Sequence, residues 1–270
     1  MKRILSYFLV FFTFFSLVFI PNCVFSKNDA SAIFQPRMSI VIDDFGSYDQ
    51  SGVDLMLSVN EPLTCAVIPL TENTKTHLNL LSNTKHEIIL HLPMQAHVSL
   101  PKDWYGETFI AVGDNQEIVN QKIEKCLKDF PKIKGFNMHI GSGVGKHKET
   151  MKCVYNFANK NNLYFLDSRT IETNATELAA KETNSIYLGR DEFLEADKNK
   201  SYSNVKFRLL EGARKAIQTG SSIVIGHVGA EGGEQTAKAI LDTLPEIKKM
   251  GVEIVPLSTL YEIAKIHHEK

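Results

Sequence analysis

The sequence predicts an α/β fold of parallel strands, and three observations support this class. From residue 38 onward, short apolar segments of strand length alternate with segments that carry apolar residues at helical spacing. Eight such strand segments can be counted, which is the number in a (β/α) barrel. The chain of 270 residues is 43% hydrophobic, which is enough for one sizeable core. A barrel is therefore expected, with a doubly wound open sheet as the alternative.

The predicted strands are apolar runs, as expected where a parallel sheet is buried on both faces. They comprise residues 38–42, 63–70, 86–93, 134–140, 163–168, 185–189, 221–227 and 252–257. The predicted helices comprise residues 48–59, 72–83, 114–130, 148–161, 173–183, 202–220, 234–251 and 258–268. In the third helix, Ile118, Ile123 and Cys126 follow the helical pattern, and Asp114 is expected to cap its start.

The first 26 residues predict an export signal. The positively charged "MKR" precedes an uninterrupted apolar run, and "PNCVFS" supplies a helix breaker and a cleavage site at Ser26. An uncleaved membrane anchor is the alternative, since the run approaches the length that spans a bilayer. Residues 27–37 would then be a linker and residues 38–270 a single catalytic domain. In either case we expect the domain to work outside the cytoplasm, in the periplasm, the cell envelope or the medium.

The net charge gives no indication of a nucleic-acid partner, and the cysteine spacing gives no indication of a metal site. The formal net charge is −1 and no long basic run occurs, so nucleic acid is not an expected partner. A membrane contact is expected only through the N-terminal segment, if it stays uncleaved. Cys65, Cys126 and Cys153 have no metal-like spacing and are either buried apolar residues or one disulfide and a spare thiol.

Reactive side chains gather at the predicted strand ends, where (β/α) barrels place their chemistry. They are Asp43, Asp44, His91, Asn137, His139, Asp167, Arg169 and His227. One aspartate and two histidines form a common ligand set for a hydrolytic zinc ion with open positions for water. A second carboxylate can take the proton of that water, and another histidine can protonate the leaving group. Extended neighbours point in different directions, so one aspartate could bind metal while the other stays free.

Several of these features also have a plainer interpretation. Either aspartate could cap a helix, and His91 could be a hydrogen-bonded core histidine. Asp167 and Arg169 could simply pair with each other. Trp104, in a long loop over residues 94–113, could stack on a sugar or anchor that loop on the barrel. The glycines of "GHVGAEGG" could cradle a phosphate, as in a phosphoesterase, or only permit a tight turn.

Five motifs in order carry a resemblance to a known family. They are "IDDFG", "HEIILHLPM", "GFNMHIGS", "FLDSRT" and "GHVGAEGG". From about Met38 to Ile263, the chain resembles the divergent polysaccharide deacetylases, a branch of the metal-dependent carbohydrate esterases. The resemblance implies a distorted (β/α) barrel. It also implies Asp43 as general base, Asp44 and His91 as metal ligands, and His227 as general acid.

The chain departs from the ordinary polysaccharide deacetylases at one ligand position. Gln95 stands where those proteins have a second histidine, so the resemblance implies His139 on the next strand as the third ligand. Asn137 is expected to orient substrate or a ligand. Asp167 and Arg169 are expected to orient His227 or the base.

The resemblance implies a hydrolase that removes acetyl groups from an acetylated sugar or polysaccharide, and the N-terminal signal predicts that this hydrolase is exported. A divalent metal, with zinc as the first choice, is the expected cofactor. An acetylated glycan is the expected partner, with Asn137 and Trp104 as substrate contacts. The alternatives are a catalytically weak or inactive glycan-binding or scaffold protein of the cell envelope, and a phosphoesterase.

Overall fold

The computed structural model describes residues 35–101, 104–196 and 200–268. Its strands are β1 Arg37–Phe45, β2 Thr64–Val67, β3 Glu87–Met94, β4 Gly135–Ile140, β5 Tyr164–Asp167, β6 Leu188–Gly189, β7 Glu192–Phe193, β8 Ser221–His227 and β9 Glu253–Ile254. Its α-helices are α1 Val53–Leu57, α2 Thr74–Ser82, α3 Gln116–Cys126, α4 Lys148–Lys160, α5 Ala175–Glu182, α6 Tyr202–Thr219, α7 Gly233–Lys249 and α8 Leu257–His268.

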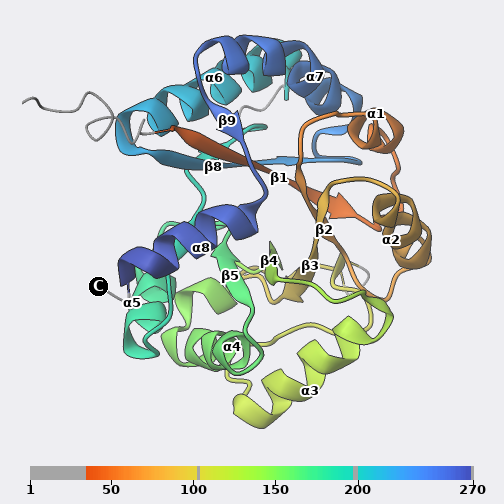
Figure 1. The fold of residues 1–270 in the computed structure, drawn as a ribbon. Helices are drawn as coiled ribbons and strands as arrows, with labels where there is room; N and C mark the ends of the chain where they lie inside the picture. Colours follow the sequence, from red (N-terminus) through yellow and green to blue (C-terminus); the bar gives the residue numbers. More distant parts are fainter. Residues whose placement is uncertain (1–34, 102–103, 197–199, 269–270) are drawn as a thin grey trace, which may run out of the picture. The chain divides into compact units, whose positions relative to one another are not determined.

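The strands form one curled parallel sheet with helices around it (Figure 1). The spatial order is β6-β5-β4-β3-β2-β1-β8-β7, and β9 pairs with the start of β1. The chain thus moves one strand at a time in one direction, and β8 returns beside β1. This order confirms the predicted (β/α) barrel over the doubly wound sheet. The barrel is distorted, because among the described residues no strand pair joins β6 to β7.

Alternation along the strands divides the core into an outer and an inner part. Outward side chains such as Ile40 of β1 and Leu90 of β3 pack against the surrounding helices. Inward side chains such as Val41, Ile89 and Ile225 form a separate cluster inside the barrel. Beyond this cluster, toward the carboxyl ends of the strands, the inward positions become polar. The apolar cluster thus packs directly against the polar layer that forms the site.

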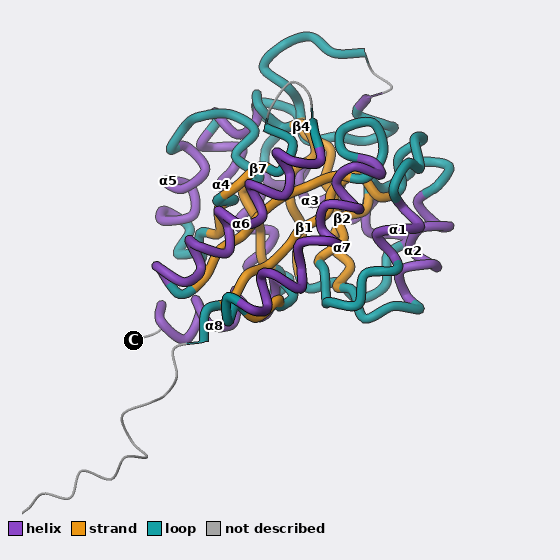
Figure 2. Tube along the Cα trace, turned by 90° about the horizontal axis from the view of Figure 1, so that it is seen from above, coloured by secondary structure: helices purple, strands orange, loops and turns teal. Residues whose placement is uncertain are grey.

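Helix α8 closes the opposite end of the barrel. The backbone N–H of Leu257 donates to Thr64 Oγ1 at the start of β2, and that of Ser258 donates to Glu87 Oε2 at the start of β3. These bonds satisfy two free N–H groups of the first turn of α8. In Figure 2 the long loops lie at the side of the domain away from α8.

Three local predictions differ from the structure. Asn115, not Asp114, caps α3, because its side chain accepts the N–H of Ile118, while Asp114 accepts from Ala111 N–H and Lys122. The strand β7 was not predicted, since two residues are too short to show an alternation. The predicted helix over residues 48–59 is limited to Val53–Leu57 and follows a turn.

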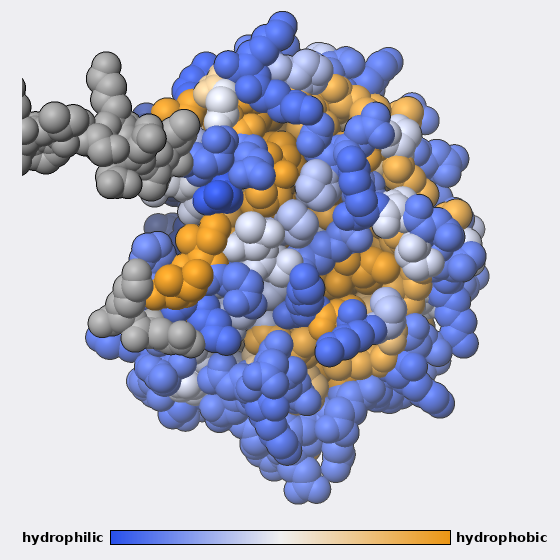
Figure 3. Space-filling view, in the orientation of Figure 1, coloured by the Kyte–Doolittle hydropathy of each residue, from blue (hydrophilic) through white to orange (hydrophobic). Residues whose placement is uncertain are grey.

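The described helices are polar outside and apolar inside, and on the face shown in Figure 3 hydrophilic side chains predominate. No helix in the described ranges is long and apolar enough to cross a bilayer. The predicted signal or anchor, residues 1–26, lies outside the described residues, as does the predicted linker up to residue 34. Cys65, Cys126 and Cys153 are all free thiols, and the first two are buried.

Candidate metal and catalytic site

The end of β1 can present two adjacent carboxylates on one side because the strand is bulged. Ile42 pairs with Cys65 of β2, and Phe45 pairs with Val67, so β1 has one extra residue between these pairs. Such a β-bulge redirects side chains and is frequent next to active sites. Within the bulge, Asp44 has a left-handed backbone with φ of 69°, a conformation that aspartate adopts more readily than most residues. Both carboxylates consequently line the same cavity.

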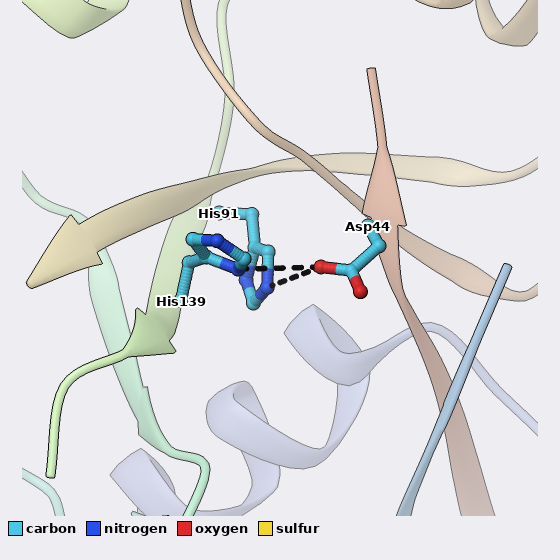
Figure 4. A group of neighbouring side chains, drawn as sticks. All are labelled: Asp44, His91 and His139. Carbon is cyan, nitrogen blue, oxygen red and sulfur yellow. Dashed lines mark ion pairs between the residues drawn. The ribbon is translucent and has the colours of Figure 1, made fainter. Parts of the chain in front are cut away.

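Three side chains from three strands meet at the carboxyl end of the sheet: Asp44 of β1, His91 of β3 and His139 of β4 (Figure 4). Asp44 Oδ1 lies 3.3 Å from His91 Nε2 and 3.2 Å from His139 Nδ1. One ligand atom from each residue lies within 4.8 Å of the ligand atoms of the other two. The structure therefore brings together the three residues that were predicted to share a metal ion.

The surroundings of Asp44 Oδ1 fit a cation. This oxygen is buried and has no hydrogen bond of good geometry from any described residue, although two imidazole nitrogens lie beside it. Burial opposes the charge on Asp44, but the two histidines outweigh it and hold the pKa of the carboxyl well below its usual range. An ionised oxygen with two imidazole nitrogens is a ligand set for zinc, and also for manganese, cobalt or iron.

Asn137 connects His91 to the other carboxylate, Asp43. His91 Nδ1 lies 2.7 Å from Asn137 Oδ1, and Asn137 Nδ2 donates to Asp43 Oδ1 at 2.7 Å. Because the amide oxygen can only accept, His91 donates from Nδ1 and its Nε2 lone pair is left for a metal. Burial raises the pKa of Asp43, which suits a proton acceptor. Asp43 Oδ2 lies 3.8 Å from His91 Nε2 and faces the metal-binding side.

His227 of β8 is the register neighbour of Asp43 and is held by Glu195. His227 Nδ1 lies 3.0 Å from Glu195 Oε2, and its backbone N–H donates to Glu195 Oε1, also at 3.0 Å. Burial opposes the imidazolium, but the Glu195 hydrogen bond and the nearby negative charges outweigh it and raise the pKa of His227 to about 9. His227 is therefore protonated at neutral pH, and Nε2 is free to donate.

Glu195 also contacts the start of α7, next to the glycine-rich segment "GHVGAEGG". Thr236 Oγ1 in the first turn of α7 donates to Glu195 Oε1 at 2.6 Å. A Cβ at Gly232 would lie only 2.4 Å from the same oxygen, so this glycine makes room for the carboxylate. The carboxylate of Glu195 therefore lies at the start of α7. The phosphoesterase interpretation would place the phosphate of its substrate at this position.

Asp167 and Arg169 do not make the orienting contacts that were expected of them. Asp167 accepts the N–H of Arg169 at 2.8 Å and the hydroxyl of Tyr187 at 3.0 Å. Arg169 donates to the backbone oxygen of Arg190 at 2.9 Å. Glu195 instead contacts His227, and Asn137 contacts Asp43. Asp167 ends β5 on its outward face, away from the cavity side. Arg169 still lines the cavity.

Sequence reasoning missed Glu195 for an identifiable reason. The residue follows the two-residue strand β7, and the site residues were sought only at the ends of predicted strands. Its signal was a glutamate directly after the apolar pair Phe193 and Leu194, where a strand end was not recognised. Arg190 was missed likewise, although it lines the cavity and lies 4.9 Å from the centre of the Phe193 ring.

Of two further predicted positions, Trp104 lies beside the metal-binding group and Gln95 lies in the loop after β3. The backbone oxygen of Trp104 lies 3.2 Å from His139 Nε2, and Trp104 is one of the residues that line the cavity. Gln95 accepts the N–H of Val112 at 2.9 Å and so holds the loop after β3. Gln95 therefore holds this loop, and His139 is the residue that lies beside Asp44.

The proposed metal ligands and the proposed base and acid lie in one open cavity of about 1310 Å³. The two aspartates and the three histidines His91, His139 and His227 line it. Its walls also include two arginines, Arg169 and Arg190, and two exposed aromatic residues, Tyr48 and Trp104. A cavity that combines possible metal ligands, a buried base and a charged acid has the components of a metal-assisted hydrolytic site.

Comparison with known proteins identifies the family of the chain. The family model of the divergent polysaccharide deacetylases matches residues 40–261. The uncharacterised protein YibQ of Escherichia coli K12 is 29% identical over 199 residues, which are 73% of this chain and 60% of that protein. The chain therefore matches only about three fifths of the length of this curated relative.

Solved structures show the same fold at low sequence identity. The uncharacterised protein ATU2773 of Agrobacterium tumefaciens C58 has a TM-score of 0.75 and 18% identity, over 85% of this chain and 91% of that one. The Bc1960 peptidoglycan N-acetylglucosamine deacetylase has a TM-score of 0.50 and 14% identity, over 84% of this chain and 89% of that one. With a family model that covers most of its length, the chain belongs to the divergent polysaccharide deacetylases.

Proposed function

We propose that this protein is an exported, metal-dependent hydrolase that removes acetyl groups from an acetylated glycan. The observation that carries the proposal is the group of Asp44, His91 and His139 around one buried oxygen. Family membership supports the reaction class, and the solved peptidoglycan deacetylase of the same fold supports an N-acetylated sugar as substrate. The apolar N-terminal run of the sequence supports export.

A zinc ion held by these three residues would supply a Lewis acid for the acetyl carbonyl and would acidify a water molecule. Asp43 accepts the proton of the attacking water at Oδ2, since Oδ1 is occupied by the Asn137 amide. Asn137 holds both this base and the ring of His91 in fixed positions. His227 then donates from Nε2 to the leaving amine or alcohol while Glu195 holds its Nδ1.

Metal analysis and acetate release test this proposal together. The purified protein is dialysed against zinc and incubated with N-acetylated and O-acetylated oligosaccharides. We expect stoichiometric zinc in the unaltered protein and in the Asp43→Asn variant, but not in a His91→Gln, His139→Gln double variant. Both variants should lose at least about 100-fold in acetate release, the lower range for general acid–base catalysis.

His267→Gln, at the exposed end of α8, is the matched control and should change neither quantity. Zinc-free unaltered protein would remove the metal site. Zinc-loaded protein that binds glycan without releasing acetate would instead favour the binding or scaffold function. Release of phosphate from phosphoester substrates would favour the phosphoesterase.

A further inference from the structure

Two arginines line the cavity of the proposed metal site without a carboxylate partner. Arg169 comes after β5, and Arg190 directly follows β6. In the described ranges, neither guanidinium forms an ion pair, whereas the other three arginines there each pair with a glutamate; these are Arg37, Arg208 and Arg214. Because the planar fork of a guanidinium matches a carboxylate or a phosphate, an unpaired arginine in a cavity is a candidate anion-binding group.

Each of the two arginines is held by the backbone of the other. Arg190 Nη2 donates to the backbone oxygen of Arg169 at 3.0 Å, and Arg169 Nη1 donates to that of Arg190 at 2.9 Å. The two Nε atoms donate to the backbone oxygen of Ser168 and to the hydroxyl of Tyr187. Arg190 Nη1 and Arg169 Nη2 have no hydrogen-bond partner among the described residues. Both guanidinium groups are thus fixed in position, while one terminal nitrogen of each is available to a ligand.

The Arg190 guanidinium lies close to the proposed general acid. Its Cζ lies 4.9 Å from the centre of the Phe193 ring. The centre of the same ring lies 5.1 Å from the centre of the His227 ring. The guanidinium and the imidazole are therefore both neighbours of one phenyl ring, and a single ligand in the cavity can reach both of them.

The charge distribution of the cavity favours a singly charged anion beside these arginines. Among the described residues that line the cavity, Arg169 and Arg190 are the only cations apart from the histidines, and six lining residues are acidic. Burial lowers the pKa of Arg190, and the like charge of Arg169 lowers it further, so the two charges repel each other. An anion beside them offsets this repulsion. A doubly charged phosphate is repelled by the surrounding acidic groups more strongly than a carboxylate is.

We propose that Arg169 and Arg190 bind a carboxylate of the glycan whose acetyl group lies at Asp44. This inference rests on the proposed function and adds that the substrate is an acidic glycan, with its carboxylate on the acetylated sugar or on a neighbouring one. The available terminal nitrogens of the two guanidinium groups donate charge-assisted hydrogen bonds to the carboxylate. Because both groups are fixed near His227, the bound carboxylate orients the sugar so that its leaving group faces this histidine.

Calorimetric titration with matched charged and neutral ligands tests the inference. The zinc-loaded Asp43→Asn protein is used, so that the ligands are not consumed. One pair is N-acetylglucosamine with a carboxymethyl ether and its uncharged amide, and the other is N-acetylglucosamine linked to glucuronic acid or to glucose. We expect the charged member of at least one pair to bind at least about tenfold more tightly, which is about 1.4 kcal/mol. The pair that shows the preference identifies the sugar that carries the carboxylate.

Substitution of the arginines should remove the preference for the charged ligand. An added Arg169→Gln, Arg190→Gln double change should abolish it, while the affinity for the neutral ligands stays unchanged because the cavity is intact. Arg190→Lys alone should retain only part of the preference, since an ammonium group keeps the charge but not the planar fork. Arg214→Gln, which removes an arginine that pairs with Glu211 on α6, is the matched control and should keep the full preference.

Equal affinity for both members of each pair, or no binding of any ligand, would overturn the inference. A preference that persists in the double variant would do the same, and so would an equal loss of charged and neutral ligands, which indicates a purely structural role. Tighter binding of N-acetylglucosamine phosphate than of either carboxylate would overturn the choice of carboxylate.

Acetate release by the unaltered protein separates this inference from the proposed function. Equal release from the charged and the neutral ligands would overturn the inference and leave the deacetylase function intact. An arginine-dependent preference in binding without any acetate release would leave the carboxylate site standing and remove the enzymatic proposal.

Discussion

The two ends of the barrel strands differ in which residues adopt a left-handed backbone. At the amino ends, residues with positive φ lie one or two positions after the ends of helices, and they are Asn162, Asn184, Gly220 and Gly251. Asparagine and glycine are the residues that normally end helices in this conformation. At the carboxyl ends, the residues after the last inward side chains of β1, β4 and β5 include Asp44, Ile140 and Arg169. A β-branched isoleucine with φ of 63° is a genuine outlier.

This difference separates the part of the barrel that stabilises the fold from the part that holds the site. At the amino end, α8 covers the apolar interior, with Leu257 and Leu260 buried against Val41 and Ile89. At the carboxyl end, strained residues lie next to Asp43, His139 and Ser168 and surround an open cavity. Strained backbone at functional positions is tolerated only where the surrounding structure holds it in place. The comparison therefore predicts that substitutions at the carboxyl end impair function as well as stability, whereas those at the amino end affect stability alone.

The largest effect is expected from Glu195→Gln, which removes the charge that holds His227. We expect a loss of about 100-fold in kcat/KM, within the range for an impaired general acid. The pKa of His227 is about 9, so the acid form is lost as the pH rises through that value. In the variant this basic limb should move to lower pH. Glu234→Gln, at an exposed position in the first turn of α7, is the control and should keep the profile.

The same pair also predicts a pH dependence of stability in the metal-free protein. A histidine pKa raised from 6.5 to about 9 stabilises the fold fully below pH 6.5, and this stabilisation is lost as the pH rises through about 9. Its size is of the order of 3 kcal/mol, at about 1.4 kcal/mol per pKa unit. Urea unfolding at pH 6 and pH 10 should show this difference in the unaltered protein and little of it in Glu195→Gln. Equal pH dependence in both would contradict the assignment.

The fold was predictable wherever a strand or helix was long enough to show a period. The strands β1, β3, β4 and β8 have long apolar runs, and the polar residues at their ends could be identified by position alone. The two-residue strand β7 shows no alternation, and Glu195 was missed together with it. Asp167 was predicted to orient His227 or the base because it ends a strand, but strand parity places it on the outer face with Phe165.

The bulge in β1 shows why the geometry of the site needed coordinates. The sequence "IDDFG" has two adjacent acids, and regular alternation would put them on opposite faces. One extra residue relative to β2 allows both to face the cavity. This extra residue is a property of the pairing between two strands, so that no pattern within β1 alone could indicate it.

Two buried histidines provide a smaller test of the difference between the ends. His77 Nδ1 accepts the N–H of Gly46, two residues after Asp44, at 2.6 Å. His86 Nδ1 accepts the N–H of Leu63, before the start of β2, at 3.2 Å. Replacing either with leucine leaves a buried N–H without an acceptor, and should cost about 1–3 kcal/mol in the free energy of unfolding.

Only His77→Leu should also weaken zinc binding, by about tenfold, the lower range for residues that orient metal ligands. His77→Asn should restore the affinity, because its amide oxygen can take the place of Nδ1. Zinc affinity by calorimetry and stability by urea unfolding measure the two effects separately. If His86→Leu weakened zinc binding as much as His77→Leu, the two ends would not be functionally distinct.

The smallest effect expected is the strain energy at Ile140 itself. Ile140→Gly and Ile140→Ala both remove the half-buried side chain, so their difference reports the backbone conformation alone. At an ordinary position alanine is the more stable of the two, but a left-handed conformation reverses this order by about 1 kcal/mol. At Asn184, after α5, glycine should again exceed alanine by about 1 kcal/mol, while the native asparagine should match glycine. Thermal unfolding of the metal-free variants measures both series. If alanine proved more stable than glycine at position 140, the carboxyl end of β4 would not be strained, and the contrast between the two ends of the barrel would be lost.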